Sequence, residues 1–189
     1  VSLVLGAAEK FNIASHLKEL TKNDAAKICS CDIDDVNVFT ASHSIDERTR
    51  IFLKVQDGCD YNCSFCTIPM ARGKSRSNSI QNVLDDVTML AQSGAKEIVL
   101  TGINLGDFGK GFTGGKKRDE NFFELVKNLD RANGIERFRI SSIEPNLLSN
   151  ELIEFVANSN KFMPHFHIPL QSGSNKILGD MRRRTIPMH

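Results

Sequence analysis

Three cysteines in the stretch DGCDYNCSFCTIP have a spacing that suits ligands of an iron–sulfur cluster. Cys59, Cys63 and Cys66 are separated by three and by two residues, so their thiols lie on one short loop. Protein-bound iron–sulfur clusters usually have a full set of cysteine thiolates. Three thiolates would bind three irons of a cubane and leave the fourth iron open. An open iron can bind a substrate or a cofactor, so the motif predicts a catalytic centre.

Other uses of these cysteines remain open at this point. A structural zinc site takes four ligands, commonly from C-x2-C pairs. The gap between Cys59 and Cys63 is unusual for such a site, and no second pair lies at a suitable distance. A catalytic thiol would not require three cysteines, and the thiols could also be unliganded. For Cys29 and Cys31 we expect no ligand role.

Composition restricts the class of protein further. The 189 residues are 40% hydrophobic and 25% charged, with a net charge of +1, which is typical of a soluble globular domain. No run approaches the roughly 18 apolar residues of a membrane span, and the N-terminal stretch lacks the basic leader of a signal peptide. With five cysteines, an odd number, we expect reduced thiols in a cytoplasmic protein without membrane contact.

Basic residues are gathered locally although the net charge gives no overall attraction to nucleic acid. Any of these clusters could be a solvated surface, and the last one named could instead contact RNA phosphates. The clusters are Arg72, Lys74 and Arg76; Lys116, Lys117 and Arg118; and Arg182, Arg183 and Arg184.

The elements that must position the cysteine loop alternate between strands and helices. Apolar runs predict strands over 51–56, 97–102, 137–142 and 165–170. Helical spacing of apolar residues predicts helices after Ser79, over 122–129, after Ser149 and from Ile177. Such an order implies right-handed βαβ units and a parallel sheet, with functional loops after the strands. The predicted functional loops are 57–78, 101–118, 141–148 and 171–175.

The stretch IFLKVQDGCDYNCSFCTIPMARGKSRS resembles the radical S-adenosylmethionine (radical SAM) superfamily, and within it the methylthiotransferases. The stretch LTGINLGDFG resembles the branch that acts on N6-threonylcarbamoyladenosine in tRNA, and SSIEPNLL and HFHIPLQSGSNKILGDMRRR continue the likeness. The resemblance implies an α/β fold, a partial (β/α) barrel of the radical SAM type. It further implies that residues 1–43 are a remnant of the family's N-terminal α/β domain with its linker. Residues 44–189 would then be a radical SAM core that is incomplete at its C-terminus.

The resemblance also implies a reaction. Cys59, Cys63 and Cys66 would hold a [4Fe–4S] cluster whose open iron chelates S-adenosylmethionine, and an electron donor would reduce it to form a 5′-deoxyadenosyl radical. The product would be a methylthio group at C2 of N6-threonylcarbamoyladenosine beside the anticodon of tRNA, and a second [4Fe–4S] cluster is expected in the family's N-terminal domain. Alternatives are an isopentenyladenosine tRNA or ribosomal-protein aspartate substrate, or a non-catalytic zinc-binding RNA-interaction module.

The same resemblance implies roles for residues near the strand ends. Phe65 would lie near the adenine, although it could instead be a core aromatic residue. The TGIN segment could be a simple turn, the serines near 172–174 could be helix caps, and His165 and His167 are expected to be satisfied core or rim residues. The implied cofactor-binding residues are Gly102, Ile103 and Asn104 for the methionine amino group, Gln171, Ser172 and Ser174 for the ribose, and Ser141, Ser142 and Glu144 beside them. Arg72 and Arg76 are predicted to meet a carboxylate or phosphate of the substrate.

Overall fold

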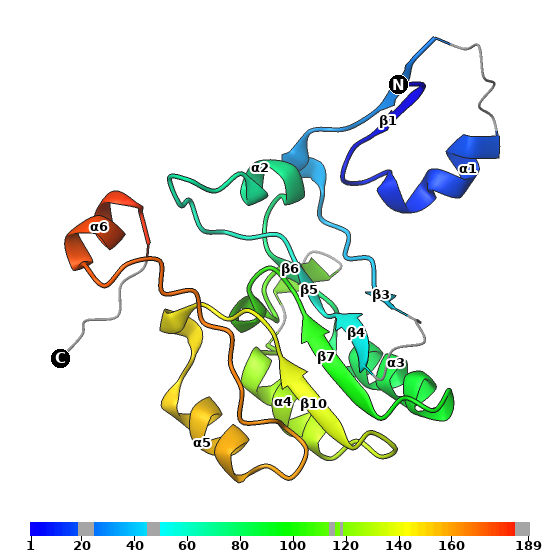
Figure 1. Cartoon of the computed structure of the whole chain (residues 1–189). Helices are drawn as coiled ribbons and strands as arrows, with labels where there is room; N and C mark the ends of the chain where they lie inside the picture. Colours follow the sequence, from blue (N-terminus) through cyan, green and yellow to red (C-terminus); the bar gives the residue numbers. More distant parts are fainter. Residues whose placement is uncertain (19–24, 45–49, 114–115, 118, 184–189) are drawn as a thin grey trace.

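A four-stranded sheet forms the centre of the chain (Figure 1). The computed structural model describes residues 1–18, 25–44, 50–113, 116–117 and 119–183. The order of the strands in the central sheet is β10-β7-β4-β3. Its parallel strands are β4 (Arg50–Lys54), β7 (Glu97–Thr101) and β10 (Arg137–Ile140), and β3 (Ser42–His43) pairs antiparallel with β4. Three predicted strands are therefore confirmed, in the predicted parallel arrangement.

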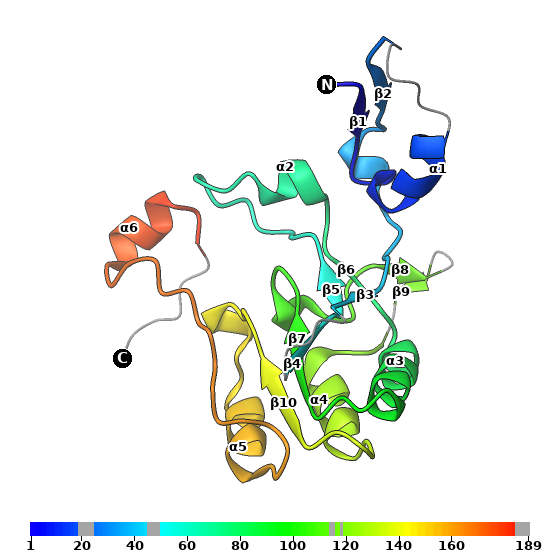
Figure 2. The same ribbon diagram turned by 45° about the vertical axis from the view of Figure 1, so that its right-hand side comes forward.

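Three helices cover one face of this sheet (Figures 1 and 2). They are α3 (Ile80–Gln92), α4 (Phe122–Asp130) and α5 (Asn150–Asn158). Each is preceded by a side chain that accepts a hydrogen bond from a first-turn N–H, namely Ser79, Asn121 and Ser149. Such caps satisfy backbone donors that the helix leaves free. The three helices confirm the predictions made from apolar spacing.

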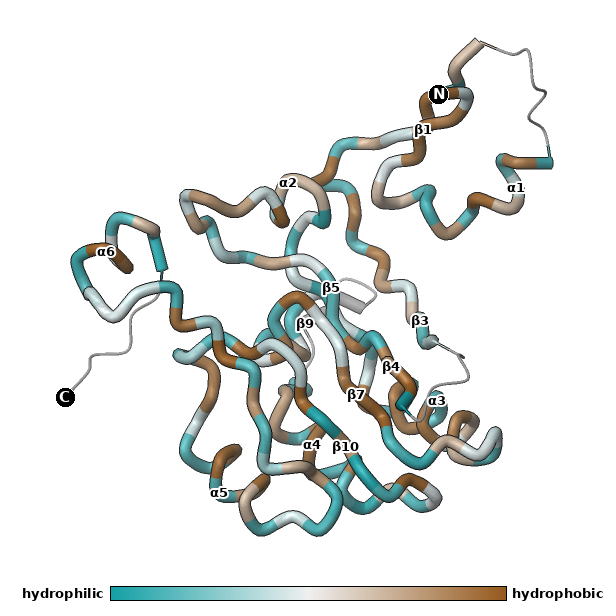
Figure 3. The backbone as a smooth tube through the Cα atoms, in the orientation of Figure 1, coloured by the Kyte–Doolittle hydropathy of each residue, from teal (hydrophilic) through white to brown (hydrophobic). Residues whose placement is uncertain are grey.

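One cluster of buried apolar side chains fills the space between the sheet and the helices. Successive strand residues point to opposite faces, so Leu53, Leu100 and Ile140 pack toward the helices and are almost fully buried. Figure 3 shows hydrophobic residues recurring along β4 and β7. Other members of the cluster are Val83, Val87, Leu90, Ile98, Leu125, Val126, Leu129, Phe138, Leu152, Val156 and Phe162. This core fixes the carboxyl ends of the strands, from which the site loops emerge.

A charged cluster joins the amino ends of the three parallel strands. The buried Glu97 carboxylate accepts hydrogen bonds from Arg137 Nε at 3.0 Å and Arg139 Nε at 2.7 Å, and Arg50 Nε lies 3.0 Å away. Burial favours the neutral acid, but the hydrogen bonds from Arg139 and Arg137 outweigh it and hold the pKa of Glu97 below its ordinary value. The cluster therefore stabilises the end of the sheet opposite to the cysteine loop.

The fourth predicted strand, residues 165–170, is not formed. The chain follows the edge of β10 but makes only isolated parallel bridges, at Phe162 and His167. Pro164 and Pro169 have no N–H to donate, and proline is disfavoured inside a sheet. The apolar pattern of this segment did not predict its structure, because Pro164 before it and Pro169 within it prevent a continuous ladder.

The two histidines of this segment are exposed and do not belong to the core. His167 Nδ1 lies 2.8 Å from Ser142 Oγ, so His167 is a hydrogen-bonded residue at the rim. The helix predicted after this segment is present as α6 (Asn175–Asp180).

The N-terminal residues form a small unit of their own, which lies apart from the central sheet in Figures 1 and 2. Strands β1 (Leu3–Leu5) and β2 (Lys27–Cys29) pair in parallel. The elements η1 (Lys10–Asn12) and α1 (Ile13–Lys18) follow β1, and η2 (Ile33–Asp35) follows β2. A parallel pair separated by a helix is an α/β arrangement. The proposed domain boundary at residue 43 stays a prediction.

Short elements shape the loops around the site. They are β5 (Gln56–Asp57), α2 (Ile68–Arg72), β6 (Arg76–Ser77), η3 (Leu105–Asp107), β8 (Phe112–Thr113), β9 (Lys116–Lys117) and η4 (Pro145–Leu147). The segment 101–118, predicted as a functional loop, thus contains a 3-10 turn and a short hairpin. Within the described ranges, no helix is long and apolar enough to cross a membrane.

Candidate functional site

The three cysteines lie on one loop between β5 and β6, beyond the carboxyl end of β4. Cys63 is buried, whereas Cys59 and Cys66 are partly exposed. The loop is closed by Cys59 N, which donates to Gly73 O at 3.0 Å. It begins at Gly58, where φ is +73° and an added Cβ would lie 2.0 Å from Lys74 O. Glycine is therefore required for the turn that presents the first cysteine.

The donor set of this loop fits a cubane cluster. Among the residues that the structure describes, no three His, Cys, Asp or Glu side chains are close enough together to hold a single metal ion. A cubane distributes its thiolates over separate irons, so its ligands need not converge on one point. Tetrahedral zinc requires four ligands at about 2.0–2.3 Å from the same ion. Three cysteine ligands therefore match a cubane with one open iron, and they are one ligand short of a structural zinc site.

Burial controls the electrostatics of Cys59. It raises the pKa of the Cys59 thiol to about 11; the Tyr61 N–H, 3.4 Å from Sγ, opposes this rise, and Asp107, Cys63 and Cys66 add to it. A thiol ligates a metal as its thiolate, and the positive charge of a bound metal promotes that deprotonation. A cluster held by this thiol would therefore supply the positive charge that favours its thiolate form.

A cavity of about 530 Å³ adjoins the cysteine loop. Its wall includes Cys59 and residues of the same loop, so space large enough for a small ligand lies beside the first cysteine. The lining residues are Asp34, Cys59, Asp60, Tyr61, Asn62, Pro69, Gly73 and Lys74.

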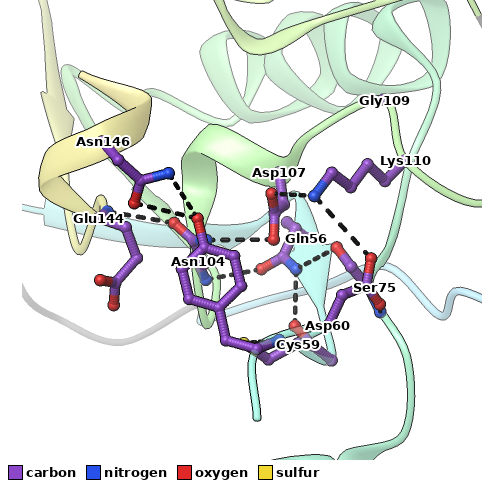
Figure 4. A network of polar contacts seen from close by, with 12 residues as sticks. Gln56, Cys59, Asp60, Ser75, Asn104, Asp107, Gly109, Lys110, Glu144 and Asn146 are labelled. Atoms are coloured by element: carbon purple, nitrogen blue, oxygen red, sulfur yellow. Dashed lines mark hydrogen bonds and ion pairs between the residues drawn. The ribbon is translucent and has the colours of Figure 1, made fainter. Parts of the chain in front are cut away.

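Gln56, which the sequence analysis did not single out, connects the cysteine loop to the loop after β7 (Figure 4). It is 1% exposed. Its Nε2 donates to Gly58 O at 2.8 Å and to Ser75 Oγ at 2.9 Å, and also to Asp57 O at 3.1 Å. Its Oε1 accepts from the N–H groups of Ile103 at 2.8 Å and Asn104 at 3.0 Å. The sequence did carry one signal for this role, because Gln56 is a polar residue at the end of a buried strand, two positions before Gly58.

The TGIN segment is held by this contact and is more than a simple turn. A Cβ added at Gly102 would lie 2.8 Å from Gln56 Oε1, so the absence of a side chain lets the two loops approach. Asn104 is buried; its Oδ1 accepts from Glu144 N at 3.2 Å and its Nδ2 donates to Asp107 Oδ2 at 3.1 Å. The Asn104 side chain thus joins the second and third site loops, and its predicted contact with the cofactor stays a prediction.

Lysine and tyrosine contacts complete the network of Figure 4. Lys110 Nζ lies 2.6 Å from the buried Asp107 carboxylate and 3.9 Å from Asp60. The buried Tyr61 hydroxyl lies 2.9 Å from Asn146 Nδ2, in η4. These contacts tie the cysteine loop to the loops after both β7 and β10.

Arg183 corrects the expectation for the C-terminal basic run. Its guanidinium pairs with both oxygens of Glu144, at 3.0 and 2.5 Å, and donates to Pro169 O at 3.1 Å. One nitrogen lies 3.9 Å from Cys63 Sγ. Burial raises the pKa of the Glu144 carboxyl, and Arg183 partly offsets that rise. Arg183 is therefore neither a solvated residue nor free for an RNA phosphate; Arg182 is exposed, and Arg184 lies outside the described residues.

Other predicted cofactor residues are placed at the same edge with varied surroundings. Phe65 is 52% exposed, which contradicts the core-aromatic alternative. Ser141 Oγ is buried and has no hydrogen-bond partner within the described part of the chain. The cap alternative is confirmed for Ser174, which accepts from Ile177 N at 3.5 Å, while Ser172 Oγ accepts from Ser174 N at 3.1 Å. Gln171 is exposed, with φ of 64°.

The two arginines predicted to bind substrate have different environments. Arg76 is buried, and it donates to the carbonyl oxygens of Val38 at 3.0 Å, Arg72 at 2.7 Å and Lys74 at 3.1 Å. Arg72 is 42% exposed and pairs with Asp57 at 3.5 Å. Only Arg72 of this pair is readily reached by a ligand, whereas Arg76 mainly organises the return of the cysteine loop.

The two remaining cysteines lie away from this loop. Cys29 is in β2, with its sulfur 4.0 Å from His16 Nδ1, and Cys31 is exposed. They belong to the N-terminal unit, and the expectation that they have no ligand role stays a prediction.

Comparison with known proteins places the chain in a family. The family model "Radical SAM superfamily" matches residues 53–187. The chain is 45% identical over 151 residues to threonylcarbamoyladenosine tRNA methylthiotransferase MtaB of Bacillus subtilis, covering 79% of the chain and 31% of that protein. It is 40% identical over 188 residues to MtaB of Rickettsia prowazekii, covering 97% of the chain and 42% of that protein.

A second substrate class occurs among the relatives, since tRNA-2-methylthio-N(6)-dimethylallyladenosine synthase of Pelagibacter ubique is 34% identical over 188 residues, with 97% of the chain and 41% of that protein covered. The chain spans less than half the length of these curated relatives. The solved structure of the radical S-adenosylmethionine methyltransferase TsrM from Kitasatospora setae matches with a TM-score of 0.51 and 17% identity, over 67% of the chain and 22% of TsrM. From the matched residues, the parallel sheet and the cysteine loop at its carboxyl edge, the chain belongs to the radical SAM superfamily.

Proposed function

We propose that this chain is the cluster-binding core of a tRNA methylthiotransferase that acts on N6-threonylcarbamoyladenosine. The observation that carries the proposal is the loop with Cys59, Cys63 and Cys66 at the carboxyl edge of a parallel sheet, in a chain 45% identical to a relative named for that activity. The cofactors would be a [4Fe–4S] cluster and S-adenosylmethionine. The partners would be tRNA and an electron donor, in the cytoplasm.

The three cysteines would hold the cluster and leave one iron for S-adenosylmethionine. When bound, the cluster supplies the electron that cleaves the cofactor. Gln56 fixes the spacing between the cysteine loop and the Ile103 and Asn104 amides, near which the cofactor's methionine part would bind. A second cluster would be held by the family's N-terminal domain.

The polar edge of the sheet supports this assignment. The exposed Phe65 ring is available to a ligand, as expected for a contact with an adenine. The buried ion pair between Glu144 and Arg183 keeps the loop after β10 beside Cys63. These residues would bind and orient the cofactor and limit the access of water.

Anaerobic reconstitution tests the proposal. The wild-type chain should bind about four irons and about four sulfides and turn brown. The triple variant Cys59→Ala, Cys63→Ala, Cys66→Ala should bind neither. The double variant Cys29→Ala, Cys31→Ala is the matched control and should load like the wild type. One equivalent of zinc without a chromophore would support the RNA-interaction module instead.

The substrate branch needs a separate test. We expect an anticodon stem-loop carrying N6-threonylcarbamoyladenosine to bind the chain more tightly than one carrying isopentenyladenosine, because the former adds a carboxylate that Arg72 can reach. Equal or reversed affinities, measured by fluorescence anisotropy, would favour the isopentenyladenosine branch, which the Pelagibacter relative represents.

A further inference from the structure

Asp57 lies among four basic side chains from four separate parts of the chain. Its carboxylate is 4% exposed. The distances from its Oδ2 are 3.4 Å to Arg76, 3.5 Å to Arg72, 3.6 Å to Lys54 and 4.0 Å to Lys10. The cluster joins η1 of the N-terminal unit to the start of the cysteine loop.

One carboxylate does not neutralise these cations. Burial lowers the pKa of Lys10, and so do the neighbouring charges of Arg72 and Arg76. Burial also lowers the pKa of Lys54, which Lys10 and Arg72 lower further while Asp57 opposes them. The only other carboxylate near the cluster in the described residues that line the adjoining cavity is the exposed Asp35. The positive charges therefore outnumber the negative ones.

A cavity of about 500 Å³ adjoins this cluster. Its charged lining residues are Asp35, Asp57 and Arg76, and Phe11, Asn12, Asn37 and Thr40 supply an aromatic ring, amides and a hydroxyl. The donors of Arg76 are occupied by carbonyl groups, so this side chain acts as a fixed part of the wall. Arg72 and Lys10 remain partly exposed beside it.

We propose that the exposed side of this cluster, next to the cavity, is a binding site for an oxyanion of the RNA substrate, with Arg72 and Lys10 as the contacting residues. Excess positive charge in a partly dehydrated place attracts an anion, and guanidinium and ammonium groups bind phosphate or carboxylate oxygens well. The ligand is either a backbone phosphate or the carboxylate of the modified adenosine. That RNA supplies it rests on the proposed function.

The test measures affinity of the chain for an anticodon stem-loop at several salt concentrations. Arg72→Ala and Lys10→Ala are compared with the control Lys96→Ala. Lys96 directly precedes β7, and its exposed side chain pairs with Glu136. Each site variant should bind the RNA about five- to tenfold more weakly at low salt. The slope of the logarithm of the binding constant against the logarithm of the salt concentration, called the salt slope, should fall in magnitude by about one. Arg72→Lys keeps the charge and should retain most of the slope. Melting curves verify that all variants are folded.

Two forms of the RNA identify the source of the oxyanion. If the site binds a phosphate, unmodified and threonylcarbamoyl-modified stem-loops should lose affinity equally, and inorganic phosphate should compete. If it binds the carboxylate, only the modified RNA should lose affinity. Folded site variants that behave like Lys96→Ala with both RNAs would overturn the proposal. Cluster loading is measured independently on the same samples, so failure of this site is distinguishable from failure of the proposed function.

Discussion

Replacing Gln56 by Met tests whether one side chain holds the two site loops together. Methionine has a similar size and shape, so the change removes five hydrogen bonds without opening a large cavity. A net hydrogen bond contributes about 0.5–1.5 kcal/mol, and unpaired buried groups cost more. Water can enter from the nearby cavity and satisfy part of them. We therefore expect a loss of about 3–4 kcal/mol in the free energy of unfolding.

Urea denaturation of the chain without cluster gives this free energy, and hydrogen exchange locates the effect. The amides of Ile103 and Asn104 should lose protection, because Gln56 Oε1 is their acceptor. Gln56→Glu keeps an acceptor but loses the donors toward Gly58 and Ser75, so it should protect these amides better than Gln56→Met while still loosening the cysteine loop.

Gln81→Met is the matched control, since Gln81 is exposed on α3 and bonds only to Asp85 in the described contacts. Its unfolding free energy should change by less than about 0.5 kcal/mol. The reasoning is refuted if Gln56→Met equals this control in stability and leaves the exchange of both amides unchanged.

Three further changes test other parts of the structure. Glu97→Gln should lower the free energy of unfolding by about 2 kcal/mol at pH 7. Because the pKa of Glu97 is lowered in the folded state, its stabilising contribution is present above the unfolded pKa and is lost as the pH falls through the folded pKa. Urea titrations of the wild type and the variant should therefore give the same free energy of unfolding in acid. Arg183→Gln should release the segment after β10, seen as faster proteolysis than in the exposed control Arg182→Gln; equal rates would contradict the role of the Glu144 pair. Gly102→Ala should lower the free energy of unfolding by about 1–3 kcal/mol, because the added Cβ would contact Gln56. Gly173 has open space around it, so Gly173→Ala should leave the free energy of unfolding unchanged in the same denaturation assay.

The local sequence determines the cluster loop and most of the sheet. Apolar spacing located α3, α4 and α5, and the serine caps at Ser79 and Ser149 marked two of their starts. These elements could be predicted because their signals lie within a few residues of one another. The strand predicted over 165–170 was wrong because it rested on the apolar residues alone and ignored Pro164 before the segment and Pro169 within it.

The long-range contacts of the site could not be predicted in the same way. Gln56 meets Ile103 and Asn104, 47 and 48 positions away, and Arg183 meets Glu144, 39 positions away. Nothing in their immediate neighbours specifies these partners, because the sheet topology brings them together. The sequence therefore indicated where charged and polar residues gather but not which of them are already paired.

The most direct test of the central claim is the electron paramagnetic resonance spectrum of the reduced, reconstituted chain, recorded with and without S-adenosylmethionine. Three cysteine ligands leave one iron open, so the spectrum should be that of a [4Fe–4S]⁺ cluster and should shift when the cofactor binds. A cluster signal that S-adenosylmethionine leaves unchanged, or an iron centre that persists when Cys59, Cys63 and Cys66 are all replaced by alanine, would contradict the account.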